Sequence, residues 1–217
     1  MMAPVRGRFI TVEGIDGAGK TTAVDHLGER LREAGIEAVA TREPGGTELA
    51  EAIRDLLKGS EGEPPCEDAE TLLVFAARAQ HLGVTIRPAL EAGQWVICDR
   101  FTDATYAYQG GGRGVPAARI RVLEEWVHGG FQPDCTLLFN LSPEEGLRRR
   151  SGEGRSNDRF EAEGLAFLEG VQAAYRERAM AAPERFHAID AGRDWSEVVR
   201  ALDEWLYREI ADWRGGA

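Results

Sequence analysis

The feature that most constrains this chain is a glycine-rich loop, Gly14-Ile15-Asp16-Gly17-Ala18-Gly19-Lys20-Thr21. A β-branched run over residues 8–13 precedes the loop, and residues 22–34 follow it with apolar side chains at helical spacing. Strand, glycine loop and helix in this order are the setting that a phosphate-binding P-loop requires. The backbone amides of such a loop surround phosphate oxygens, and the helix adds the positive end of its dipole. The sequence therefore predicts a nucleoside triphosphate site.

The loop and one later carboxylate together predict how this triphosphate is held. We expect Lys20 to reach the β- and γ-phosphates and the Thr21 hydroxyl to ligate Mg²⁺. Asp99 ends the clearest buried strand, residues 94–99, where a carboxylate can organise the same ion through water. The predicted cofactor is thus Mg²⁺, bound together with the nucleoside triphosphate. The residues predicted to bind this triphosphate are Gly14, Asp16, Gly17, Ala18, Gly19, Lys20, Thr21 and Thr22.

Length and patterning predict one α/β domain over residues 1–217. Five strand-like runs alternate with amphipathic helices, which favours a three-layer α/β/α arrangement around a five-stranded parallel sheet. A net charge of −11 argues against a nucleic-acid-binding surface. No apolar run approaches the roughly 18 residues of a membrane span, and no signal peptide begins the chain, so we expect a cytoplasmic protein. Cys98 and Cys135 lie in apolar runs and are expected to be buried free thiols.

Several segments after the first helix are candidates for the ligand-binding edge of the sheet. Residues 42–47, Arg-Glu-Pro-Gly-Gly-Thr, form a stiff turn, with Thr47 as the cap of the next helix. The simpler alternative is an ordinary connection between a strand and a helix. A further helix is expected over residues 67–90, with Phe75 and Arg78 on one face, suited to a flat base. Spacing alone leaves open that Phe75 is a core residue and Arg78 a surface charge.

Two glycine-rich stretches lie further along the chain. Residues 110–114 are expected to be flexible and unsuitable for a helix interior. Residues 148–160 combine glycines with five arginines in an acidic protein, which favours a mobile lid that brings cations to transferring phosphoryl groups. The alternative is a solvated helix end whose arginines offset the helix dipole.

These motifs narrow the class of P-loop protein. Regulatory GTPases carry an N-K-x-D sequence, which is absent. No residue stands out as a general base, whereas Arg78 and Arg100 suit an acceptor that is already an anion. A phosphate acceptor needs no deprotonation, so alignment and charge neutralisation suffice for catalysis. The pattern favours a kinase that phosphorylates a nucleoside monophosphate.

In order and spacing, the motifs resemble the thymidylate kinase family, which transfers the γ-phosphoryl group of ATP to dTMP, giving dTDP and ADP in dTTP biosynthesis. The resemblance covers residues 9 to about 190, and it rests on the P-loop, residues 42–47, Phe75 with Arg78, residues 99–101, residues 105–113 and residues 158–161. The P-loop has no arginine and the lid segment has several, as in the bacterial class whose catalytic arginine lies in the lid.

The resemblance also implies roles for individual residues. Asp16 would accept a hydrogen bond from the sugar 3′-hydroxyl, Arg100 would hold the dTMP phosphate, and Tyr108 would crowd the 2′ position. Phe75 would stack on thymine and Arg78 would bind its carbonyl edge, although in several family members the stacking phenylalanine is four residues before the arginine rather than three. The valine at that position, Val74, cannot stack. The remaining implied residues are Glu43, Pro44, Thr105 and Gln109 for the substrate, and Arg149, Arg155 and Arg159, with Lys20 and Arg100, for catalysis.

Two other functions remain open from the sequence. One is another nucleotide or deoxynucleoside kinase, which would prefer a different acceptor. The other is an ATP-binding module without turnover, which the full set of acceptor-side residues argues against. The resemblance implies a homodimer and small-molecule partners, ATP and dTMP, with no nucleic-acid or membrane partner.

Overall fold

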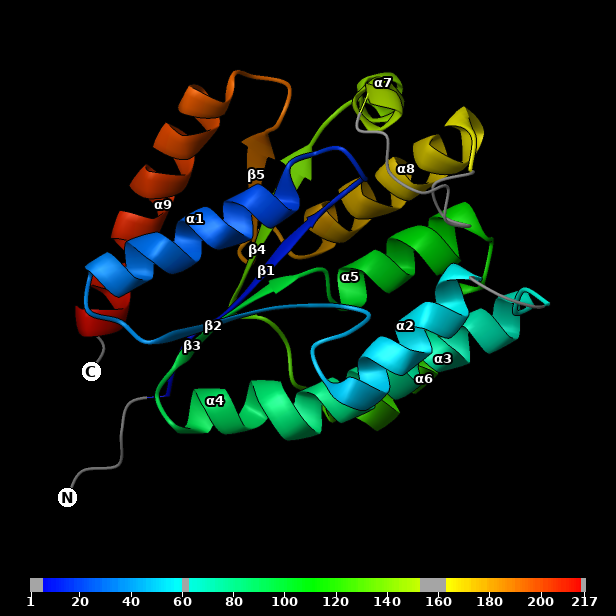
Figure 1. Ribbon diagram of the computed structural model, residues 1–217, viewed down its shortest axis with the longest axis horizontal. Helices are drawn as coiled ribbons and strands as arrows, with labels where there is room; N and C mark the ends of the chain where they lie inside the picture. Colours follow the sequence, from blue (N-terminus) through cyan, green and yellow to red (C-terminus); the bar gives the residue numbers. More distant parts are fainter. Residues whose placement is uncertain (1–5, 60–62, 153–162, 216–217) are drawn as a thin grey trace.

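In the computed structural model, which describes residues 6–59, 63–152 and 163–215, five parallel strands form one sheet (Figure 1). The strand order is β2-β3-β1-β4-β5. The strands are β1 (Phe9–Gly14), β2 (Ala38–Arg42), β3 (Trp95–Asp99), β4 (Cys135–Asn140) and β5 (Phe186–Asp190). Every residue of β1 is buried, as expected for the central strand of a parallel sheet covered on both faces. The predicted five-stranded parallel α/β sheet is confirmed.

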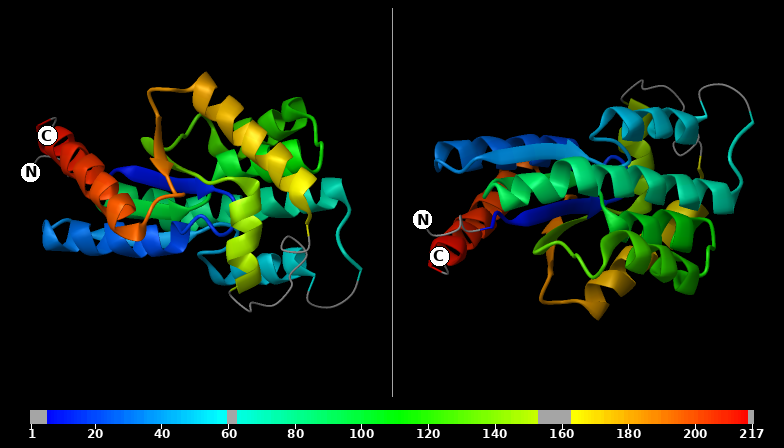
Figure 2. Two further views of the ribbon diagram at one scale, coloured as in Figure 1. Left: turned by 90° about the horizontal axis from the view of Figure 1, so that it is seen from above. Right: turned by 90° about the horizontal axis from the view of Figure 1, so that it is seen from below.

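Helices cover both faces of this sheet. They are α1 (Lys20–Glu33), α2 (Glu48–Lys58), α3 (Glu67–His81), η1 (Leu82–Ile86), α4 (Arg87–Glu91), α5 (Thr102–Thr105), η2 (Tyr106–Gly112), α6 (Ala117–His128), α7 (Pro143–Gly152), α8 (Leu165–Ala181) and α9 (Trp195–Gly215), where η marks a π-helix. Ile10 and Val12 of β1 pack in one core with α1 and α9, which lie side by side (Figures 1 and 2). Phe9 points to the other face and packs with η1 and α4. Among the described residues, no helix is long and apolar enough to cross a membrane.

The helix expected over residues 67–90 changes geometry before its end. α3 ends at His81, the π-helix η1 follows, and α4 begins next to Pro88. Proline has no amide hydrogen to donate, and its ring clashes with the carbonyl four residues earlier in a regular α-helix. The wider π-helical turn before Pro88 accommodates the ring, so the helical run continues to Glu91 with altered geometry.

The expectation that residues 110–114 cannot lie inside a helix is wrong for the first three of them. Gly110–Gly112 belong to the π-helix η2. The reason is packing rather than flexibility, because a Cβ on Gly111 would lie 2.4 Å from the carbonyl oxygen of Gly170 on α8. Because Gly111 and Gly170 both lack a Cβ, the backbones of η2 and α8 can come into contact.

Two helices begin with a side-chain capping interaction, and the sequence predicted the one at Thr47. The Thr47 hydroxyl accepts a hydrogen bond from the Ala50 amide at 3.1 Å, at the start of α2. Ser142 accepts from the Glu145 amide at 3.2 Å, at the start of α7. These caps fix where the loops before α2 and α7 end, and both helices contribute residues to the cavity at the carboxyl edge of the sheet.

Candidate functional site

The P-loop joins the carboxyl end of β1 to the start of α1 and has the backbone that its glycines permit. Gly17 and Gly19 have φ angles of +81° and +85°, in the left-handed region that favours glycine. A Cβ on Gly17 would lie 2.9 Å from the carbonyl oxygen of Gly146, because α7 lies beside the loop (Figure 2). Lys20 Nζ is buried and donates to the Ile15 carbonyl at 2.8 Å. Burial and the neighbouring Arg100 lower the pKa of Lys20, so the site favours an anion beside this ammonium group.

A cavity of about 640 Å³ opens beside the P-loop. It lies at the carboxyl ends of β1, β2 and β3, where ligands bind in parallel α/β sheets. Most of the predicted site residues line it, namely Asp16, Gly17, Gly19, Lys20, Thr21, Thr22, Glu43, Pro44, Arg78, Asp99, Arg100, Thr105, Tyr108, Gln109 and Arg149. Gly14 and Ala18 belong to the loop but are not among the lining residues.

Thr21 and Asp99, the predicted metal residues, are in direct contact. The Thr21 hydroxyl donates to Asp99 Oδ2 at 3.1 Å, although 78 residues separate them in the chain. The other carboxylate oxygen, Oδ1, is buried and has no hydrogen-bond partner among the described residues. A hydroxyl and an unpaired carboxylate oxygen are hard ligands of the kind Mg²⁺ prefers, so this pair fits the predicted ion.

Arg100 is held in an unusual backbone conformation by its neighbours. Its φ of +72° is rare for a residue other than glycine, and such strain is found mainly at functional sites. Its guanidinium donates to Asp16 Oδ1 and to the hydroxyls of Tyr108 and Tyr175, at 2.9 and 3.3 Å for the tyrosines. Burial by itself would raise the pKa of Asp16, but Arg100 and Lys20 outweigh it and hold that pKa below its usual value. Asp16 is therefore an ionised acceptor at the cavity wall.

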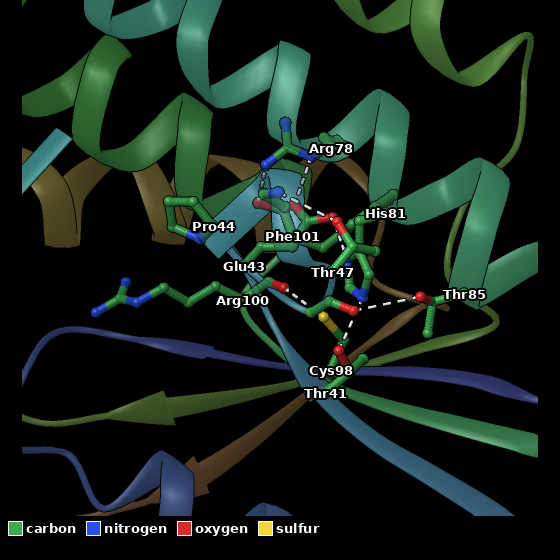
Figure 3. A network of polar contacts seen from close by, with 12 residues as sticks. Thr41, Glu43, Pro44, Thr47, Arg78, His81, Thr85, Cys98, Arg100 and Phe101 are labelled. Atoms are coloured by element: carbon green, nitrogen blue, oxygen red, sulfur yellow. Dashed lines mark hydrogen bonds and ion pairs between the residues drawn. The ribbon is translucent and has the colours of Figure 1, made fainter. Parts of the chain in front are cut away.

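Arg78 also lines the cavity and belongs to a buried network with Glu43 (Figure 3). Arg78 Nε donates to Glu43 Oε2 at 2.7 Å, and His81 Nδ1 lies 3.0 Å from Glu43 Oε1. Burial alone would raise the pKa of Glu43, yet Arg78 and His81 lower it. Both carboxylate oxygens thus have protein partners. Pro44, which follows through a cis peptide bond, also lines the cavity.

The expectation that Phe75 faces the base pocket disagrees with this structure. Its side chain is only 2% exposed and packs with Val115 and Ile120 in a separate apolar cluster. Val74 lines the cavity instead, four residues before Arg78. The reason is helical geometry, because one residue corresponds to about 100° around the axis of α3 and turns Phe75 away from the cavity. Phe75 still contacts Arg78, with the guanidinium carbon 5.0 Å from the centre of its ring.

The structure describes only part of the predicted lid. Arg149 lies on α7, donates to Glu145 and to the Gly17 carbonyl at 2.8 and 3.4 Å, and lines the cavity. Arg149, one of the arginines of the predicted lid, therefore lies beside the P-loop. Arg155 and Arg159 lie outside the described residues.

Sequence reasoning missed several residues that build the site. Tyr175 on α8 connects the buried carboxylate of Glu13 to Arg100, and no local motif marks it. Arg54 and Lys58 of α2 line the cavity, and Arg54 donates to the Pro44 carbonyl at 2.8 Å. Their four-residue spacing on an amphipathic helix was the available signal, since residues spaced four apart share a face.

Comparison with known proteins agrees with this geometry. A model of the thymidylate kinase family matches residues 12–202. The chain belongs to the thymidylate kinase family. It is 54% identical to a thymidylate kinase of Pseudomonas putida, over 96% of this chain and 99% of that protein. It is 51% identical to a thymidylate kinase of Alkalilimnicola ehrlichii, over 97% of both chains.

A solved structure supports the same assignment. The crystal structure of thymidylate kinase from Ehrlichia chaffeensis superposes with a TM-score of 0.76 at 34% identity, covering 93% of this chain and 99% of that one. The predicted family, its α/β fold and its phosphotransferase class are confirmed.

Proposed function

We propose that this family member transfers the γ-phosphoryl group of ATP to the 5′-phosphate of dTMP, giving dTDP and ADP. The observation that carries the proposal is the composition of one cavity. Lys20 and Thr21 of the P-loop line it together with two further cations, Arg78 and Arg100, which α3 and the end of β3 supply. A triphosphate donor and an anionic acceptor can therefore occupy the same space.

Different residues bind the phosphoryl donor and the acceptor. Lys20 and the P-loop amides bind the donor phosphates, and Arg149 adds charge from α7. Arg100 binds the acceptor phosphate, while Asp16 accepts a hydrogen bond from the sugar. The acceptor phosphate is already an anion, so alignment and charge neutralisation replace a general base. Thr21 and Asp99 would hold Mg²⁺, which would supply further positive charge beside the phosphates.

Arg78, Thr105 and Gln109, which line the same cavity, bind the base. Thr105 Oγ1 and Arg78 Nη1 are buried and have no hydrogen-bond partner among the described residues, and both residues line the cavity. Gln109 is fixed there by a hydrogen bond from its amide to Glu70 at 2.8 Å. Buried polar atoms without a partner cost free energy, which a ligand's polar atoms offset on binding.

We also propose that the enzyme works as a cytoplasmic homodimer on these small molecules. Large apolar side chains are exposed on α3, η1 and α6, and α3 packs against α6. They are Leu72, Val84, Val122 and Trp126, with Trp126 82% exposed. A second copy of the chain would remove this surface from water.

An ADP-release assay with ATP–Mg²⁺ and parallel acceptors (dTMP, dUMP, dCMP, dGMP, AMP and thymidine) tests the function. We expect dTMP to be preferred. Lys20→Ala and Arg100→Ala should each lower kcat/KM by roughly a hundredfold or more, since each removes a charge aimed at the reacting phosphates. Arg208→Ala, on the exposed side of α9, is the matched control and should retain wild-type activity. Preference for another acceptor would refute the assignment of dTMP, and ATP binding without turnover would indicate a binding module.

A further inference from the structure

Arg78 is held firmly in the wall of the cavity, and one nitrogen of its guanidinium has no hydrogen-bond partner among the described residues. Its side chain is 1% exposed, Nε donates to Glu43, and Nη2 donates to the Phe101 carbonyl at 2.9 Å. The guanidinium carbon also lies 5.0 and 5.1 Å from the ring centres of Phe75 and Phe101. Only Nη1 has no hydrogen-bond partner within the described part of the chain. The direction of this donor therefore depends on how firmly the rest of the guanidinium is held.

Glu43 in turn is held by His81, which is completely buried on the same face of α3 as Arg78. Because an ionised carboxylate only accepts hydrogen bonds, the proton at the 3.0 Å contact belongs to His81 Nδ1. The other ring nitrogen, Nε2, lies 2.8 Å from the Thr41 hydroxyl at the end of β2. The result is a chain of polar contacts, Thr41–His81–Glu43–Arg78, that runs from the sheet to the cavity (Figure 3).

We propose that Glu43 and His81 are positioning residues that aim Arg78 Nη1 at the edge of the acceptor's base, so that the site selects a carbonyl oxygen there over an amino group. The proposal rests on the proposed function, because it concerns how the dTMP site reads its base. A guanidinium only donates hydrogen bonds, so it pairs with the carbonyl that thymine presents and meets another donor in the amino group of cytosine. Neither His81 nor Thr41 lines the cavity, so both act through Glu43.

The geometry distinguishes this role from simple support of the loop over residues 43–47. Thr85 also holds that loop, since its hydroxyl donates to the Gly46 carbonyl at 3.3 Å, but it makes no contact with Glu43 or Arg78 in the network. Loss of loop support should affect every acceptor alike. Loss of Arg78 alignment should reduce the preference between bases, since only that preference depends on the direction of Nη1.

Two substitutions of His81 separate its two contacts. The amide of His81→Asn can take the place of Nδ1 and donate to Glu43, whereas that of His81→Gln reaches the Nε2 position and leaves one Glu43 oxygen without its donor. We expect His81→Gln to lower the ratio of kcat/KM for dTMP over dCMP by about tenfold, as for loss of one hydrogen bond to a charged group. KM for ATP should stay unchanged. His81→Asn should keep the ratio within about threefold of wild type, and Thr85→Ala should leave it unchanged.

Arg78→Met separates failure of this proposal from failure of the proposed function. If wild-type enzyme does not prefer dTMP, the function itself is wrong. If it does, and Arg78→Met lowers the preference while His81→Gln and Glu43→Gln leave it intact, the positioning role is overturned. An equal loss in Thr85→Ala would overturn it as well, because loop support would then be the cause. Should His81→Gln fail to fold, Thr41→Val removes the outermost contact and is expected to lower the same ratio to a smaller degree.

Discussion

Replacing Glu13 by glutamine should change how the stability of the enzyme depends on pH. Glu13 lies on β1, is completely buried, and accepts hydrogen bonds from the Phe101 amide at 2.7 Å and the Tyr175 hydroxyl at 2.8 Å. Burial, with the nearby charge of Asp103, raises its pKa from 4.5 to about 7. At about 1.4 kcal/mol per pKa unit, this difference corresponds to roughly 3 kcal/mol of folding free energy at most.

The direction of the change in stability with pH depends on whether the folded or the unfolded state binds the Glu13 proton more tightly. The folded protein has the higher pKa, so the contribution of neutral Glu13 is complete below pH 4.5 and is lost as the pH rises through about 7. Glutamine is neutral throughout and keeps an acceptor for the Phe101 amide. The free energy of unfolding of Glu13→Gln, taken relative to that of the wild type, should therefore increase by up to about 3 kcal/mol between about pH 5 and about pH 8.

Urea unfolding followed by tryptophan fluorescence across this pH range measures the effect as a difference between variant and wild type. That difference removes the pH dependence of all groups that the two proteins share. Glu125→Gln, at an exposed position on α6, is the control and should show a difference that does not vary with pH. A difference for Glu13→Gln that is equally constant would refute the argument, because the buried carboxyl would then be ionised at no extra cost.

Three further predictions address the ion, the packing and the assembly. Asp99→Asn should raise the Mg²⁺ concentration needed for half-maximal rate by roughly ten- to a hundredfold, and an unchanged Mg²⁺ dependence would contradict the assigned role. Gly111→Ala should destabilise the fold by about 1–3 kcal/mol in urea unfolding, because its methyl group meets the Gly170 carbonyl. Gly28→Ala in α1, where a Cβ meets nothing within 4 Å, should instead be neutral or stabilising. Trp126→Glu should lower the mass measured by analytical ultracentrifugation to that of a monomer, and an unchanged mass would place the contact elsewhere.

The parts of the fold that the sequence predicted are those governed by local patterns. The five strands are short β-branched or apolar runs, and Thr47 begins its helix through a capping interaction with a near neighbour. The π-helix over residues 106–112 was not predictable in this way, because its glycines are required by α8, which follows more than fifty residues later. Contacts between distant segments leave no periodic signal in either segment.

The same distinction applies inside the site. Lys20, Thr21 and Asp99 follow from the chemistry of a P-loop and a strand end, and the structure places them around one cavity. Phe75 was expected there from its three-residue spacing to Arg78 and from the family motif. One position along α3 decides whether a side chain faces the cavity or the core, and Val74 faces the cavity. Motif spacing identifies the helix that carries a site more reliably than the residue that faces it.

His81 shows why the supporting residues of a site escape such reasoning. A lone histidine near the end of an amphipathic helix is read as a helix-end charge or a core residue, and nothing nearby in the chain suggests Glu43 or Thr41 as its partners. Both partners come from β2 and the turn after it, about forty residues earlier, and only the tertiary fold brings them into contact with His81. A cation such as Arg78 can be predicted from the chemistry of its ligand, whereas the groups that aim it are set by tertiary packing. In the proposed mechanism of base selection, His81 and Thr41 act without lining the cavity.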